Sequence, residues 1–499
     1  MTDTAAHTSD HFTIRSEDTS TVEEVTVPSP GPMAIFVVLA AVASGLVVAL
    51  GFQAVKPNTP FVILGGTLLV AAILAIVGLY RYQWFLLITL AIRPALDDLV
   101  ADEFGSFQPS AILGILVILV TSLHLISRRA HGRWKHGTHM SLGYIAFFVL
   151  FVPSFITSVD RGVSQAAMFG VASVMLLYIA MEQHLMDDRR FMYRMLTASL
   201  LGLIVPTITG FVQFGWTGTL DPGGSGLIRI DGSFAHPNTY ATFLVFAILM
   251  MIGVAPTLDV RRRLILLSFT TFTAFLMVAS FARGAWASFL LGALLMASRV
   301  NKKLVFVIGF GAVAAAAAVP GVGDRIDNLF ATTGAGGGVK TDDSLGWRIG
   351  YWGRIWPFFY NNPVTGIGID ATKTQTVEGK DPHNSFLQPI IEGGVVGAIG
   401  FFGLLIIATI AALKLWRLTK GTSLDHRTKM ISVASITAVF SVSAQLLTEN
   451  VMLNTVVWWY INIALAWIAV VVWRPESEPA EPESIEDQLD VRQPIEELV

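Results

Sequence analysis

The sequence predicts an all-α polytopic membrane protein, and its composition and long apolar blocks support that prediction. The chain of 499 residues has a mean hydropathy of +0.63 and only 14% charged residues, whereas soluble domains average about 25%. Apolar blocks such as 33–52, 61–80 and 304–319 match the bilayer, because a helix needs about 20 residues to cross it. So many blocks of this length disfavour the alternative, core helices buried in a large soluble protein.

We predict about 12–14 transmembrane helices. The third candidate segment, Gln83 to Arg93, is short for a membrane span. The candidate segments lie near 33–53, 61–80, 83–93, 110–127, 141–159, 164–182, 192–214, 238–256, 264–281, 284–299, 304–320, 386–413, 429–449 and 454–473.

Basic residues near the ends of these segments predict which side each connection faces. Clusters of Lys and Arg fall at every second connection, and such clusters mark the cytoplasmic side. Both termini are therefore predicted in the cytoplasm, in a multi-pass protein of the cytoplasmic (inner) membrane. The clusters lie in 128–135, 189–194, 261–263, 302–303 and 414–429.

The same map predicts the domain organisation. The tails are polar or acidic and should be disordered, and one long extracytoplasmic loop separates two groups of helices. The predicted units are a cytoplasmic tail 1–32, an N-terminal transmembrane bundle 33–320, the extracytoplasmic loop 321–385, C-terminal transmembrane helices 386–473 and an acidic cytoplasmic tail 474–499. A net charge of −3 argues against nucleic-acid binding, and the absence of cysteine excludes thiolate metal sites and Cys nucleophiles.

The predicted loop contains a Gly-rich connector and then an amphipathic helix. The run ATTGAGGGV at 331–339 lacks the Lys-Ser/Thr of a phosphate-cradling loop. Asp343 or Ser344 can cap a helix that runs to about Tyr360. Apolar and aromatic residues share one face of it, so we expect this helix to lie in the membrane interface. That face carries Leu345, Ile349, Trp352, Trp356 and Phe359.

Cationic and titratable residues gather on the predicted outer side. Arg229 precedes a span, Arg283 lies in a tight turn, and Arg348 and His383 belong to the long loop. Ionisable residues at membrane depth are energetically expensive, so each is a functional candidate. For any single arginine the alternative is snorkelling to lipid phosphates, and a lone loop histidine is more often structural than catalytic.

Short motifs in the C-terminal half contain these residues. They read R-I-D-G-S-F-A-H-P-N at 229–238, S-F-A-R-G-A-W at 280–286, N-P-V-T-G-I-G at 362–368, and P-H-N-S-F-L-Q with E-G-G-V-V-G at 382–397. In this order they resemble the O-antigen ligase/polymerase superfamily of bacterial integral membrane glycosyltransferases, which implies a GT-C-like fold. The first 200 residues match that family only as hydrophobic spans.

The resemblance implies roles for individual residues. Arg283 and Arg348 match arginines implied to hold the pyrophosphate of a polyprenyl-linked sugar donor, and we group Arg229 with them. His383 matches the implied catalytic base. The predicted supporting residues are Asn238, Trp352, Asn384 and Glu392.

The chemistry of these residue types agrees with such a transfer. Pyrophosphate is a weakly basic leaving group, and guanidinium groups can stabilise the charge that develops on its oxygens without a metal. A histidine, whose unperturbed pKa is about 6.5, suits deprotonation of an acceptor hydroxyl. One displacement at the anomeric carbon predicts inversion. No cofactor is expected, and no D-x-D motif suits a metal site on the outer face.

Several alternatives stay open from the sequence. Glu392 is the second candidate for the base, or it orients His383. The acceptor is a glycan, a glycolipid or a lipid, so ligase and polymerase are not distinguished. A secondary transporter would place ionisable residues near the midplane in repeated halves, and a non-catalytic component of a polysaccharide export complex would tolerate changes at Arg283 or His383.

Overall fold

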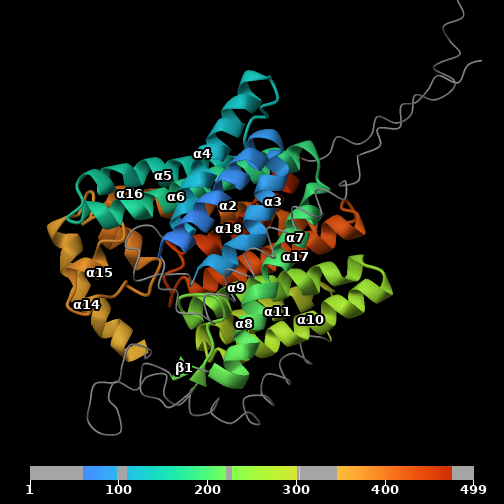
Figure 1. Cartoon of the computed structure of the whole chain (residues 1–499). Helices are drawn as coiled ribbons and strands as arrows, with labels where there is room; N and C mark the ends of the chain where they lie inside the picture. The colour runs from blue at the N-terminus through green and yellow to red at the C-terminus, as the bar shows by residue number, and fades with distance from the viewer. Residues whose placement is uncertain are drawn as a thin grey trace, which may run out of the picture.

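The computed structural model describes residues 60–97, 109–217, 219–220, 228–300, 303 and 345–474. Almost all of this part is helical (Figure 1). The helices are α2 (Pro60–Tyr80), α3 (Tyr82–Ile92), η1 (Arg93–Leu96), α4 (Pro109–Ala130), α5 (His139–Ile156), α6 (Arg161–Asp187), α7 (Phe191–Gly202), α8 (Ile204–Val212), η2 (Gln213–Thr217), α9 (Pro237–Val254), η3 (Ala255–Thr257), α10 (Val260–Ala279), α11 (Arg283–Val300), α14 (Leu345–Asn361), α15 (Thr372–Gln375), α16 (Leu387–Leu418), α17 (His426–Gln445) and α18 (Thr455–Trp473).

The helices confirm an all-α polytopic membrane protein. Eight of those described are long and apolar enough to cross a membrane, and each overlaps a predicted segment. α11 and α17 occupy predicted segments as well but are less apolar. The predicted segments 33–53 and 304–320 lie outside the described residues. The short third segment is the helix α3, which is 11 residues long.

The predicted span 192–214 contains a break. α7 ends at Gly202 and α8 begins at Ile204, with Pro206 in the first turn of α8. Proline has no N–H for the helical ladder and is tolerated best near a helix start. The carbonyl of Pro206 accepts a hydrogen bond from the Tyr240 hydroxyl of α9 at 3.1 Å. A side chain of the neighbouring helix α9 therefore bonds to a backbone carbonyl beside the break.

Two helices form the centre of the bundle. The apolar windows of α18 and α9 are 89% and 78% buried inside the protein, whereas those of α4 and α10 are 28% and 33% buried. α18 packs on α6 and α17, and α9 packs on α17 and α10. The remaining helices surround these two, and their outer faces are left uncovered.

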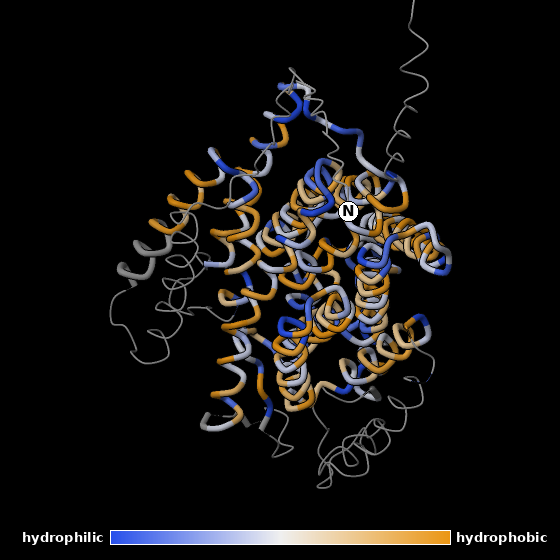
Figure 2. Tube along the Cα trace, turned by 90° about the vertical axis from the view of Figure 1, so that its right-hand side faces the viewer, coloured by the Kyte–Doolittle hydropathy of each residue, from blue (hydrophilic) through white to orange (hydrophobic). Residues whose placement is uncertain are grey.

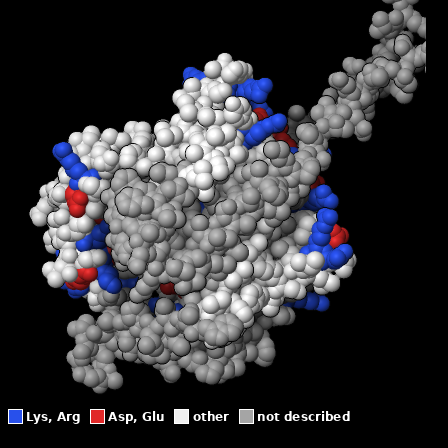
Figure 3. Space-filling view, viewed as in Figure 1, with Lys and Arg blue, Asp and Glu red and all other residues white. Residues whose placement is uncertain are grey.

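The uncovered faces are apolar, as contact with lipid requires. On α16 the exposed residues Val395, Ile399, Ile406 and Ile410 recur at helical spacing. Figure 2 shows hydrophobic residues along the bodies of the helices and hydrophilic residues mostly near their ends. Figure 3 shows the charged side chains of the described part mostly at the margins of the molecule. This distribution fits a bilayer around the helix bodies.

The loop described from residue 345 onward folds against the start of α16. α14 and α15 lie at one side of the bundle, next to one end of α16 (Figure 1). Tyr351 and Ile355 of α14 are fully buried and form a small core with Ile367, Ala371 and Ile391. Burying a side chain such as Ile355 contributes about 1.5–3 kcal/mol. This part of the loop is therefore packed onto the membrane helices.

The predicted interfacial helix is present, and it has a second buried face. α14 ends at Asn361, close to the expected end. Ile349 on the predicted apolar face is 55% exposed, as a lipid-facing residue would be. Arg348 and Tyr351 are buried against the protein instead. Trp352, Trp356 and Phe359 of the predicted apolar face also pack against the small core. The spacing along the sequence therefore predicts the helix and its apolar face, but not that most of this face contacts the protein.

α16 is interrupted where the loop meets it. Gly394 has a φ of 59° and a ψ of −160°, outside the helical region, which glycine tolerates because it has no Cβ. The interruption frees backbone groups: Val395 N donates to Pro363 O at 2.9 Å and Gly368 N donates to Glu392 O at 3.1 Å. The N-P-V-T-G-I-G motif thus pairs with the E-G-G motif and fixes the position of the loop.

Candidate active site

A polar cavity of about 310 Å³ lies where the loop meets the ends of α9, α16 and α18. Its volume is at the lower end of the range of small-molecule sites. His383, Asn238, Gln388 and Glu449 line it, together with further polar residues. Two predicted site residues, His383 and Asn238, therefore reach one cavity although 145 residues separate them in the sequence. The remaining lining residues are His236, Thr239, Thr242, Asp370, Lys373, Asp381, Asn450, Val451, Leu453, Asn454 and Val457.

Glu449 connects the predicted residues from different parts of the chain. Its Oε1 atom accepts a hydrogen bond from Asn238 Nδ2 at 3.0 Å and pairs with Arg348 Nη2 at 3.4 Å. Arg348 also donates to the carbonyl of Thr448. Both charged side chains are largely buried, with 9% and 13% exposure. A buried charge must be paired to be tolerated, so this contact holds α14 against the segment between α17 and α18.

Arg229 is positioned by a short hairpin. β1 (Thr219–Leu220) and β2 (Ile228–Arg229) pair antiparallel with Thr219 opposite Arg229. Arg229 Nη2 donates to Asn238 Oδ1 at 2.8 Å, and its Nε donates to Ser280 O at 3.1 Å. The chain Arg229–Asn238–Glu449–Arg348 is thus continuous. This hairpin lies between the predicted spans 192–214 and 238–256 and was not predicted from the sequence.

Arg283 begins α11 directly after the predicted tight turn. Phe281 of that turn has a φ of 52°, which a non-glycine residue seldom adopts. Gly284 lies close to Thr448, since a Cβ atom added at Gly284 would stand 3.3 Å from Thr448 Oγ1. The turn therefore approaches the same Thr448–Glu449 segment that Arg348 contacts.

Side chains of α14 hold the segment that carries His383. Trp352 Nε1 donates to the carbonyl of Pro382 at 2.7 Å. The Tyr351 hydroxyl donates to the carbonyl of Lys380. His383 itself has a φ of 49°. Its ring lies edge-on to Trp347, with 6.4 Å between the ring centroids. Trp352, predicted as a supporting residue, therefore supports the backbone beside His383.

The residues after His383 fix the start of α16. Asn384 Oδ1 accepts hydrogen bonds from Phe386 N at 2.9 Å and Leu387 N at 3.0 Å, which satisfies free donors at the helix start. Ser385 Oγ donates to Glu449 O at 2.7 Å and accepts from Val451 N at 2.8 Å. Asn384 therefore supports the site through the backbone, and Ser385 ties the loop to the Glu449 segment.

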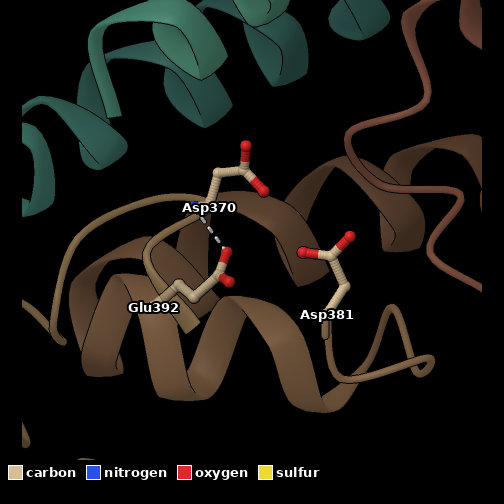
Figure 4. A group of neighbouring side chains, drawn as sticks. All are labelled: Asp370, Asp381 and Glu392. Carbon is tan, nitrogen blue, oxygen red and sulfur yellow. Dashed lines mark hydrogen bonds between the residues drawn. The ribbon is translucent and has the colours of Figure 1, made fainter. Parts of the chain in front are cut away.

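Glu392 lies in a group of three carboxyl side chains. One carboxylate oxygen each of Asp370, Asp381 and Glu392 lies within 4.8 Å of the others, and Figure 4 shows the three side chains converging. Glu392 accepts hydrogen bonds from Asp370 N at 2.7 Å and Gln388 Nε2 at 3.1 Å. Lys373 Nζ pairs with Asp370 Oδ2 at 2.7 Å. These contacts give Glu392 a role in holding Asp370 and Gln388.

The electrostatics of this group follow from its burial. Removal from water raises the pKa of Asp370 to about 6, and the Lys373 ammonium opposes that rise. Burial also raises the pKa of Asp381. Three carboxyl oxygens at this spacing are a donor set that hard cations such as Ca²⁺ accept. The Lys373 ammonium already supplies one positive charge to the group.

Several residues at the cavity were not predicted from the sequence. Asp370, Lys373 and Asp381 follow the N-P-V-T-G-I-G motif, and Asp381 directly precedes Pro382-His383. Glu449 ends an otherwise apolar predicted span on its outer side. An acidic residue at that depth is itself a functional signal, and it was present in the sequence.

A comparison with known families covers three of the four motifs that carry the resemblance, at 280–286, 362–368 and 382–397, and leaves the motif at 229–238 outside the match. The model of the family described as O-Antigen ligase matches residues 266–402. The matched region covers most of α10, then α11 and α14, and ends within α16. No curated protein matches the chain.

Proposed function

From the match of residues 266–402 to the family described as O-Antigen ligase, we propose that this membrane protein transfers a glycan from a polyprenyl-pyrophosphate donor to an acceptor hydroxyl. The reaction takes place at the extracytoplasmic face of the cytoplasmic membrane. It needs no metal, and it inverts the anomeric configuration.

Each residue has a defined part in the proposed reaction. Arg229, Arg283 and Arg348 bind the pyrophosphate and stabilise the charge that builds on its oxygens. His383 accepts the proton of the acceptor hydroxyl, whose oxygen attacks the anomeric carbon. The bond from that carbon to the pyrophosphate oxygen breaks, and polyprenyl pyrophosphate leaves with the bonding electrons. The glycan is then linked to the acceptor.

One observation carries the proposal: the polar cavity brings the His383 loop to the network that holds two of the arginines. His383, Asn238 and Glu449 line the same cavity, and Asn238 and Glu449 bind Arg229 and Arg348 directly. Arg348 Nε is buried and has no hydrogen-bond partner among the described residues. A buried donor of this kind favours an anionic ligand.

The test is a transfer assay in membranes with a panel of polyprenyl-pyrophosphate-linked glycans. His383→Ala, Arg283→Ala and Arg348→Ala should each lower transfer by about a hundredfold or more, because each removes transition-state stabilisation worth about 2.7 kcal/mol or more. Product stereochemistry, read by NMR, should be inverted. Transfer should persist in EDTA.

Arg354→Ala is the matched control. Arg354 lies on the same helix as Arg348, but its guanidinium is about half exposed and pairs with Glu378 at 2.9 Å. Transfer should stay near the wild-type rate in this variant. Full activity of the His383, Arg283 and Arg348 variants at normal expression would refute the mechanism.

A further inference from the structure

The cavity is lined by two groups of residues that come from different parts of the chain. One group contains Asn238 and Glu449, which hold Arg229 and Arg348. The other group comes from the loop and the start of α16, and His383 lines the same cavity. That second group, called the acidic wall below, consists of Asp370, Lys373, Asp381 and Gln388.

Asp370 and Gln388 of the acidic wall are held in place by Glu392. Glu392 contacts the backbone N–H of Asp370 and the side chain of Gln388, and its own side chain is fully buried. Lys373 pairs with Asp370 on the cavity side. The wall therefore presents two carboxyl groups, one ammonium and one amide at fixed positions.

The acidic wall also contains acceptor atoms without donors. Gln388 Oε1 and Asp381 Oδ1 are buried and have no hydrogen-bond partner among the residues that the structure describes. Gln388 is fully buried, and its Nε2 is already used by Glu392. A buried acceptor left unsatisfied costs about 1–3 kcal/mol. A ligand that brings O–H or N–H groups to this wall would remove that cost.

We propose that the acidic wall binds the acceptor, and that it recognises the hydroxyl groups of an unphosphorylated sugar. This inference rests on the proposed function, because it assigns the part of the cavity opposite the pyrophosphate. Carboxylates and an amide oxygen accept from sugar hydroxyls, and Lys373 donates to a ring or hydroxyl oxygen. The wall lies beside His383, where the attacking hydroxyl must lose its proton.

Charge explains the selectivity. Two carboxyl groups of the acidic wall face a single ammonium, so phosphate or carboxylate groups on the acceptor are repelled. Arg229 and Arg348, which are proposed to bind the pyrophosphate, contact Asn238 and Glu449 rather than the acidic wall. We therefore assign the donor to the Asn238–Glu449 side of the cavity and the acceptor to the acidic wall. Neutral and amino sugars are the accepted class.

The first measurement is binding without turnover, on the full-length protein in lipid nanodiscs. Saturation-transfer NMR would compare neutral methyl glycosides and a methyl glycoside of an amino sugar with glucose 6-phosphate and a methyl glucuronide. The neutral and amino glycosides should give the stronger transfer. Asp370→Asn and Asp381→Asn should weaken their binding by about tenfold, the equivalent of one lost charge-assisted hydrogen bond.

The second measurement is acceptor kinetics in the transfer assay. Both Asn variants should raise the acceptor KM by about tenfold, while the Kd for polyprenyl pyrophosphate stays at its wild-type value. Asparagine is isosteric with aspartate and tolerates the φ of 64° at Asp370, so Asp370→Asn should fold. Lys373→Gln is a third variant with the same expected direction. Glu378→Gln is the control, since Glu378 pairs with Arg354 and does not line the cavity.

The outcomes separate the two proposals. Glycoside binding that depends on Asp370, in a protein that transfers no glycan, would support the subsite and refute the proposed reaction. Transfer with a wild-type acceptor KM in both Asn variants would overturn the subsite and leave the reaction standing. Calorimetric binding of Ca²⁺ or Mg²⁺ to the wild type that Asp370→Asn abolishes would make this wall a cation site, which also overturns the inference.

Discussion

Glu449 joins Arg348 of the loop to Asn238 of α9 through a single carboxylate oxygen. Hydrogen bonds to charged groups contribute about 1.5–3 kcal/mol each. Breaking this junction would remove the carboxylate that pairs with Arg348 and holds the amide of Asn238, whose oxygen binds Arg229. At the scale of single residues, Glu449 therefore positions the arginines that are proposed to bind the donor.

Glu449→Gln should test that positioning role. The amide keeps the size of the side chain and loses the charge, so transfer should fall by about ten- to a hundredfold through weaker transition-state stabilisation. The pyrophosphate Kd and kcat should be measured separately, together with the thermal unfolding midpoint in detergent. Glu449→Asp, which restores the charge, should recover part of the activity.

A purely structural role predicts a different result. In that case both Glu449 variants would lower the unfolding midpoint and the amount of folded protein, and kcat per folded molecule would not change. Such a result would remove Glu449 from the proposed site.

At the scale of elements, the junction between α16 and the loop places His383 and Glu392 on the same side of the bundle. Two glycines allow the close approach. A Cβ atom at Gly366 would stand 2.3 Å from Glu392 O, and one at Gly394 would stand 2.4 Å from Val364 O. Both residues also have positive φ values. The junction therefore requires glycine at these two positions of the N-P-V-T-G-I-G and E-G-G motifs, because a side chain would clash with the facing backbone.

Gly394→Ala should destabilise the junction. The φ of 59° and the clash with the Val364 carbonyl together cost about 1–3 kcal/mol or more. Thermal unfolding should show a lower midpoint, and hydrogen exchange should be faster in α14 and α15. Gly403→Ala on the same helix is the control: a Cβ there meets nothing within 4 Å, and alanine favours a helix by about 1 kcal/mol. Equal midpoints for the two variants would contradict this explanation.

At the scale of the whole molecule, the helices form a multi-pass membrane protein whose site lies at one end of the bundle. The basic clusters predict that this end is extracytoplasmic. The cavity, the loop helices and the start of α16 all lie there. A donor carried in the outer leaflet would reach the cavity from that side.

Single-cysteine labelling should confirm the orientation, because the chain has no cysteine of its own. Val377→Cys in the loop, where the native side chain is fully exposed, should react with a membrane-impermeant maleimide in intact cells. Arg262→Cys in the first turn of α10, where the native side chain is 77% exposed, should react only after permeabilisation. The opposite pattern would invert the predicted topology and place the site in the cytoplasm.

Much of the fold is determined by the sequence alone. Apolar blocks of bilayer length identify the helices because lipid leaves the backbone no other partner for its polar groups. The motifs around Arg229, Arg283, Arg348 and His383 identify the candidate site residues through a resemblance. The sequence predicts the helix 345–361 from its apolar face and a terminating Asn-Pro pair; the predicted capping residues Asp343 and Ser344 lie outside the described residues.

Only the tertiary structure decided how these residues are connected. Glu449 has partners 101 and 211 residues away, Arg348 and Asn238. Asp370 and Asp381 meet Glu392 across a loop, and no local pattern encodes such contacts. Periodicity and composition indicate whether the face of a helix is apolar enough to contact lipid or the protein core. Which polar groups converge depends on helix packing and on a backbone interruption at Gly394, and both arise from contacts between segments that are distant in the chain.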